Sequence, residues 1–170
     1  MERTDPDLAA DERTMLGQYL DYHRATLVAK ARGVDAAGQA KTVGRSSLTL
    51  AGLVKHAALN EDHWFSVILH DRPQSEPFAS APWGEDPDWE FTTAVHDDLE
   101  DLIALYEATC KRSRAAVAEV ADLDQMSART SRRGERFSAR WILLHMLEET
   151  ARHNGHADLL RENVDGVTGE

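Results

Sequence analysis

Residues 137–163 read FSARWILLHMLEETARHNGHADLLREN and carry the strongest helical signal in the chain. Apolar residues recur in this stretch at intervals of three and four, the period of an α-helix with one face in a protein core. Ser138 is a favourable N-cap because its hydroxyl can accept a hydrogen bond from a free backbone N–H. We therefore expect a helix from residue 138 to about residue 161. It runs through Trp141, Ile142, Leu144, His145, Leu147, His153, Leu159 and Leu160.

Three further segments show the same period, and no stretch of comparable length alternates with period two. They span about 8–32, from 46 or 47 to 71, and from 92 or 93 to about 120. Gly33 is the expected stop of the first, and Pro73 requires the second to end by Asp71. Four helices of about 22–28 residues predict an all-α fold, a four-helix bundle. The inner faces are expected to include Leu8, Tyr19 and His23 in the first segment, Leu53 and Trp64 in the second, and Val95, Leu99, Tyr106 and Cys110 in the third.

Two long connections separate the predicted helices. Residues 71–91 hold four of the five prolines and two of the four tryptophans, and connections of this length are more often functional or crossovers than tight hairpins. Trp83 and Trp89 could form a lid over a site or fasten the connection to the helices. The second connection, about 122–137, contains Arg129, Arg132, Arg133 and Arg136, which could attract an anion or balance the acidic body.

The composition limits the class of protein. A chain of 170 residues with 42% apolar and 29% charged residues predicts a single folded domain over residues 1–170. Its net charge of −11 argues against nucleic acid or an anionic membrane as a partner. Cys110 is the only cysteine, which excludes an internal disulfide. The sequence has no apolar run of about 20 residues and no signal-peptide pattern at its start, so we expect a cytoplasmic protein.

Three side chains with ligand chemistry share one face of the last predicted helix. His145, Glu149 and His153 follow one another at intervals of four, and residues four apart on a helix have Cβ atoms about 5–6 Å apart. Such a pair can hold one divalent ion. His156 lies at the edge of the same face. The alternative is an amphipathic helix whose polar residues form hydrogen bonds between helices.

The second predicted helix supplies a possible partner for that face. The run LVKHAALNEDHWF, residues 53–65, places His56 on the apolar stripe, where an imidazole without a partner is costly to bury. If the second and fourth helices are neighbours, His56 can meet Glu149 and His153. Two histidines and one carboxylate are typical of catalytic zinc and of open non-haem iron sites. The alternative is a core histidine bonded to a backbone carbonyl.

Three stretches resemble the DinB-like superfamily: SSLTLAGLVKHAALNEDHWF (46–65), residues 137–163 and DGVTGE (165–170). A fourth stretch, ERTMLGQYLDYHRATLVAKARGV (12–34), resembles the first helix of the actinobacterial branch of that superfamily, a group of small proteins of unknown function. The resemblance implies a four-helix bundle, often dimeric, with a divalent metal on His56, Glu149 and His153. The commonest DinB-like form has His at the position of Glu149. The related mycothiol-dependent maleylpyruvate isomerases have Glu there.

The resemblance also implies a metal-dependent enzyme that uses mycothiol or bacillithiol, either as an S-transferase or as an isomerase acting on a small electrophile. Zn²⁺ is the metal we expect first, with Ni²⁺, Fe²⁺ and Mn²⁺ as alternatives, and the partner is a second copy of the chain. Arginine accounts for 15 of the 19 cationic residues, which is typical of GC-rich actinobacterial genomes and favours mycothiol. No side-chain nucleophile is expected, since Cys110 is interpreted as a packing residue. The alternative function is a non-catalytic metal-binding or structural bundle for partner binding or stress response.

Several other polar residues could assist such a site. His63 returns to the face of His56 and could be an outer-shell group or alternative ligand, or it could simply face solvent. His145 could donate to Glu149 or contact substrate, although a core hydrogen bond is also consistent. Arg152 could bind a carboxylate or form a surface ion pair. His156 could join a structural network, and His70 and His96 are expected to be exposed.

Overall fold

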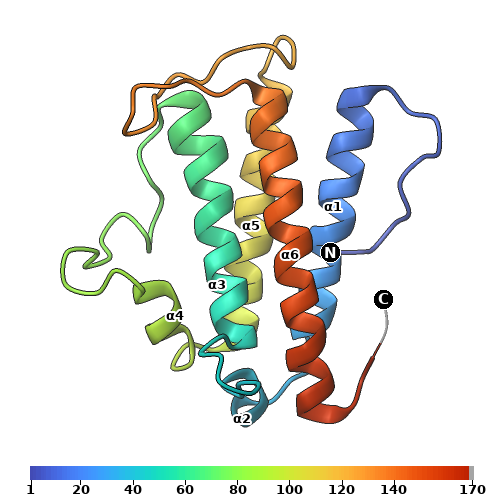
Figure 1. The fold of residues 1–170 in the computed structure, drawn as a ribbon, viewed down its shortest axis with the longest axis vertical. Helices are drawn as coiled ribbons and strands as arrows, with labels where there is room; N and C mark the ends of the chain where they lie inside the picture. Colours follow the sequence, from blue (N-terminus) through green and yellow to red (C-terminus); the bar gives the residue numbers. More distant parts are fainter. Residues whose placement is uncertain (169–170) are drawn as a thin grey trace.

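The computed structural model describes residues 1–168, and its elements are helices joined by loops (Figure 1). No strand occurs within those residues, although Met126 and Ser138 form an isolated antiparallel bridge. The prediction of an all-α fold is confirmed. The elements are α1 (Glu12–Ala31), α2 (Ala36–Gln39), α3 (Leu50–Glu61), the π-helical segment η1 (Asp62–Ile68), α4 (Trp89–Ala94), α5 (Leu99–Ala118) and α6 (Ala139–Asp165). Gly169 and Glu170, the end of the DGVTGE run, lie outside the described residues.

Helix ends follow the capping residues more closely than the apolar pattern. Ser138 caps α6 as predicted and accepts a hydrogen bond from the Trp141 N–H. The helix then continues past residue 161 to Asp165 and ends at Gly166, whose φ of 79° suits glycine. The second long helix starts later than expected, because Thr49 rather than Ser46 or Ser47 supplies the cap.

The first helix also starts later than predicted, because Asp11 caps it and accepts a hydrogen bond from the Thr14 N–H. Leu8 therefore lies outside the helix and is 100% exposed, so its assignment to the core is wrong. Tyr19 is 45% exposed and is likewise not a core residue. Trp141, Leu144 and Leu159 on α6 are exposed as well.

The third predicted helix is two helices. Asp98 accepts hydrogen bonds from the N–H groups of Glu100 and Asp101 and so begins α5. Such a side chain competes with the backbone for the first free donors, which explains why α4 stops at Ala94 instead of continuing. Val95 consequently lies between the two helices and is only partly buried. Cys110, in contrast, is fully buried as predicted.

The long helices pack in pairs around an apolar core. α1 packs mainly against α6 and α3 against α5, while α3 also contacts α6 and α4 covers α3 (Figure 1). One buried cluster includes Leu53 and Tyr106, and a second includes Phe65 and Met146. This packing brings α3, η1 and α6 together along one side of the core. Within residues 1–168 no helix is both long and apolar enough to cross a bilayer.

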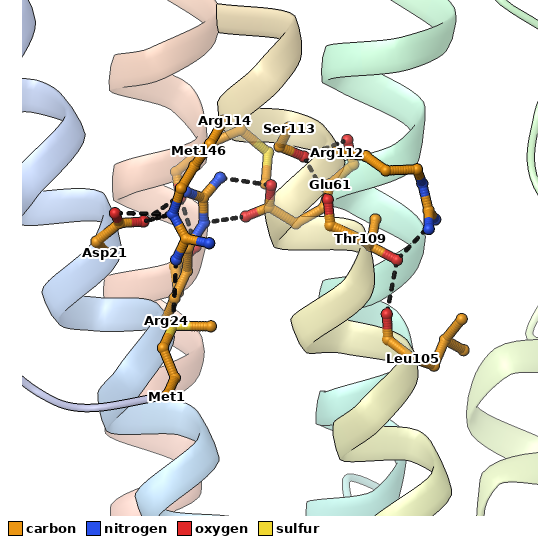
Figure 2. A network of polar contacts seen from close by, with 11 residues as sticks. Met1, Asp21, Arg24, Glu61, Leu105, Thr109, Arg112, Ser113, Arg114 and Met146 are labelled. Atoms are coloured by element: carbon orange, nitrogen blue, oxygen red, sulfur yellow. Dashed lines mark hydrogen bonds and ion pairs between the residues drawn. The ribbon is translucent and has the colours of Figure 1, made fainter.

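A buried ion pair ties α1 to α3. Figure 2 shows Arg24 of α1 directed at Glu61, whose carboxylate oxygens accept from Nε and Nη2 at 2.7 and 2.6 Å. Both side chains are inaccessible to solvent, and Nη1 of Arg24 also donates to Asp21 at 2.7 Å. Although burial lowers the pKa of Arg24, the Glu61 carboxylate raises that pKa above its ordinary value. The guanidinium of Arg24 therefore stays charged inside the core.

The proline-rich connection 71–91 is held to the helices by aromatic contacts. Trp83 donates its indole N–H to the carbonyl of Phe78 at 2.9 Å, and Phe78 is fully buried. The rings of Trp83 and Trp89 meet edge to face at 5.6 Å, and the ammonium of Lys55 lies 4.0 Å from the centre of Trp89. These contacts favour the interpretation that the tryptophans fasten the connection to the core.

Candidate metal centre

The structure brings His56, Glu149 and His153 together. Each offers one ligand atom, and these atoms all lie within 4.8 Å of one another. Glu149 and His153 share a face of α6 because they are one turn apart, and Oε2 of Glu149 lies 3.3 Å from Nε2 of His153. His56 reaches them from α3, and its ring lies edge-on to His153 with 5.0 Å between centroids. All three side chains are partly buried.

The burial and the protonation state of His153 are consistent with a metal ligand. Both of its ring nitrogens are buried, and among residues 1–168 neither forms a well-aligned hydrogen bond, although Glu149 lies near Nε2, which is unusual for a buried polar group. Burial, reinforced by the proximity of His56, lowers the pKa of His153. The imidazole is therefore neutral near pH 7 and has a free lone pair. Two imidazole nitrogens and a carboxylate oxygen suit a first-row divalent ion and leave a further coordination position open.

His56 is held by side chains rather than by a backbone carbonyl. Its Nδ1 lies 3.0 Å from Oε1 of Glu90, and its Nε2 lies 3.0 Å from Nδ2 of Asn60. Because a carboxylate accepts and an amide NH₂ donates, Nδ1 carries the proton and Nε2 carries the lone pair. The ring also stacks on Phe91 at 4.8 Å. A carboxylate behind one nitrogen of a histidine is the usual way to orient the other nitrogen toward a metal. Because the Nε2 lone pair accepts from the Asn60 amide here, that amide has to turn away for Nε2 to bind a metal.

Glu90 was not among the residues selected from the sequence. It lies on α4, a short helix that overlaps the end of the segment interpreted as a connection, and no local pattern in the sequence marks its burial. Lys55, next to His56, donates to Thr93 at 2.7 Å and to Asp97 at 2.6 Å. These bonds fasten the C-terminal end of α4 and the residues that follow it to α3, which helps to position Glu90 behind His56.

Glu90→Gln is expected to weaken Zn²⁺ binding about 10–100-fold, because the neutral amide is a poorer acceptor for the Nδ1–H of His56. A competition titration against a chromogenic chelator measures the affinity. Glu85→Gln is the matched control, since Glu85 is an exposed glutamate of the same connection, and its affinity should equal that of the unmodified protein. Equal affinities for both variants would remove Glu90 from the site.

The structure places the other predicted site residues outside the triad. The ring of His145 stacks on that of Trp141 with 4.8 Å between centroids and meets that of Trp64 at 4.7 Å, so His145 lies among aromatic side chains. Arg152 is exposed and pairs with Glu148 one turn before it at 2.8 Å, which matches the surface alternative.

The remaining histidines differ in their burial. The ring centroids of His156 and His153 are 5.7 Å apart. The Nδ1 atom of His156 is buried and has no hydrogen-bond partner among residues 1–168. His63 is partly buried beside Trp64. His96 is exposed as predicted. The expectation that His70 is exposed is wrong, because its Nε2 reaches the carbonyl of Ala116 at 2.9 Å across the η1–α5 contact.

Comparison with known proteins identifies one related family. A family model described as Mycothiol-S-transferase matches residues 15–166, nearly the whole chain. The matched region contains every member of the triad as well as Glu90. A comparison with curated proteins found no significant match.

Proposed function

The chain belongs to the mycothiol S-transferase family, and we propose on this basis that it is a metal-dependent enzyme that joins mycothiol to a small electrophile. The observation that supports the proposal is the convergence of His56, Glu149 and His153 from two helices. Such a donor set, with a neutral buried histidine and an oriented partner, is typical of a catalytic metal site with an open position.

The triad would hold a divalent ion, with Zn²⁺ expected first and Ni²⁺, Fe²⁺ or Mn²⁺ as alternatives. A bound divalent cation supplies one chemical effect, the stabilisation of a thiolate at neutral pH. The chain's own residues prepare the site: Glu90 retains the Nδ1 proton of His56, and Phe91 fixes the plane of that ring. In the transfer, the thiol proton leaves to solvent, a sulfur–carbon bond forms, and the leaving group departs with its bonding electrons.

The nucleophilic sulfur is expected to come from the co-substrate. Cys110 is fully buried in α5, and burial raises the pKa of its thiol. A protonated, inaccessible thiol is a poor nucleophile. Glu149, which the resemblance connects with the maleylpyruvate isomerases, favours thiol-assisted isomerisation as the second candidate reaction.

The assembly is also a proposal. We expect one DinB-like four-helix bundle over residues 1–170, with long connections after the second and third long helices, and the pairing of α1 with α6 and of α3 with α5 supports it. The family resemblance supports a homodimer. We also expect a cytoplasmic location.

The purified protein is expected to contain about one divalent ion per chain by elemental analysis. It should also convert a bimane or chloroarene electrophile only when mycothiol is present. Cys110→Ala should retain this turnover, because the reacting sulfur is imported. Bound metal without thiol-dependent turnover across several electrophiles would contradict the proposal and support a non-catalytic metal-binding protein.

A further inference from the structure

A row of aromatic side chains leads along α6 to the candidate metal centre. Five residues follow one another at intervals of four: Phe137, Trp141, His145, Glu149 and His153. Residues four apart on a helix are neighbours on its surface. The first three carry aromatic rings, and the last two belong to the triad. The row therefore brings aromatic surface up to the metal ligands, with His145 about 6 Å along the helix axis from Glu149.

The aromatic side chains contact one another and remain open to solvent. The ring of Trp141 contacts those of Phe137 and His145, with 4.6 and 4.8 Å between centroids. Trp64 of η1 meets the rings of all three at 5.2, 5.4 and 4.7 Å, distances typical of aromatic pairs. Trp141 is 43% exposed. We call these four residues the aromatic cluster.

The aromatic cluster and the triad lie along the same junction of two neighbouring segments (Figure 1). The ring of His56 meets that of His153, and eight residues further along η1 the ring of Trp64 meets that of His145, eight residues before His153. The two segments therefore run in opposite directions with the cluster next to the triad. The side chain of Glu149 is 27% exposed, so solvent reaches the triad beside the cluster.

The chemistry of the cluster suits a planar, electron-poor ring. The faces of indole rings carry negative charge density, so they attract a ring whose own face has been depleted of electrons by nitro groups. The same depletion makes a ring carbon open to attack by a thiolate. The imidazole of His145 always carries at least one N–H, which a nitro oxygen can accept. Recognition and reactivity thus require the same property of the ligand.

We propose that the aromatic cluster binds the electrophile and selects nitroarene-type rings over aliphatic electrophiles. The proposal rests on the proposed function, which supplies a thiolate at the triad. With chlorodinitrobenzene the thiol sulfur bonds to the ring carbon, chloride leaves with its bonding electrons, and the thiol proton goes to solvent. Trp141 is the residue that determines this specificity, since its exposed ring is available for stacking.

Binding of the ring can be measured without any reaction. Dinitrobenzene carries the electron-poor ring without a leaving group, and the indole N–H resonances of the four tryptophans report its position. Titration of the metal-loaded protein should shift the resonances of Trp64 and Trp141. Those of Trp83 and Trp89 should stay in place, because these two rings contact each other at the proline-rich connection. Shifts at Trp83 and Trp89 alone, or at no tryptophan, would overturn the assignment.

Trp141→Ala should weaken dinitrobenzene binding about tenfold. Leu144→Ala is the matched control, because it truncates another exposed apolar residue of α6, and it should bind dinitrobenzene as the unmodified protein does. With mycothiol as nucleophile, Trp141→Ala should raise the KM for chlorodinitrobenzene about tenfold at nearly constant kcat. The KM for iodoacetamide, an electrophile without a ring, should not change.

The outcomes separate this inference from the proposed function. Dinitrobenzene bound at the aromatic cluster, without thiol-dependent turnover of either electrophile, supports the ring site and contradicts the enzymatic proposal. Turnover of both electrophiles with unchanged KM values in Trp141→Ala contradicts the ring site and leaves the enzymatic proposal standing. Equal losses with chlorodinitrobenzene and iodoacetamide would show that Trp141 does not discriminate between them, and the specificity assignment would be wrong.

Discussion

His56→Ala and His153→Ala should each reduce bound metal from about one ion per chain to a trace after dialysis against a mild chelator. Each substitution removes one of the three donors, within residues 1–168, whose ligand atoms lie within 4.8 Å of one another. Loss of an outer-shell partner alone typically weakens a metal site 10–100-fold, so loss of a direct ligand should weaken it by more than about 100-fold. Elemental analysis of the dialysed proteins gives the result.

A second measurement separates loss of metal from loss of folding. Because metal binds the native state, saturating Zn²⁺ should raise the thermal unfolding midpoint of the unmodified protein and leave the midpoints of both variants almost unchanged. His96→Ala is the matched control, since His96 is an exposed histidine and should leave metal content and midpoint unaffected. Full retention of metal by either triad variant would show that the ion binds elsewhere.

The part of the site that lies on regular helices could be predicted from the sequence. Glu149 and His153 are one helical turn apart, so their common face follows from the period of α6 alone. His56 attracted attention because an imidazole on an apolar stripe requires a partner. The contact between α3 and α6 completed the set, and that contact depended on the fold resemblance rather than on spacing.

Other features depended on tertiary contacts that no local pattern reveals. Glu90 lies 34 residues from His56, on the short helix α4. Lys55 and Asp97 make an ion pair that fixes this short helix to α3. A charged residue within a helical sequence is ordinarily assigned to solvent, so the burial of Glu90 was not foreseen. The orientation of His56 is therefore a property of the assembled core.

The same reasoning explains why the pair Arg24–Glu61 was missed and why its removal should have a large effect. Arg24→Met is expected to lower the free energy of unfolding by about 3–5 kcal/mol, because it leaves the Glu61 carboxylate buried without its two N–H donors (Figure 2). Glu61→Leu alone should also be destabilising, since it leaves the buried guanidinium with only its bond to Asp21. Equilibrium unfolding in urea measures both effects.

The double variant Arg24→Met/Glu61→Leu shows whether the ion pair stabilises the protein more than two apolar side chains would in its place. Two apolar side chains of similar volume leave no charge unpaired, and such replacements are often neutral or better, so most of the lost stability should return. Arg152→Ala is the surface control: its pair with Glu148 is exposed, and its loss should cost less than about 1 kcal/mol. If Arg24→Met costs no more than this control, Glu61 must be neutral in the folded protein. If the double variant is as unstable as the single ones, the ion pair itself stabilises the junction of α1 with α3.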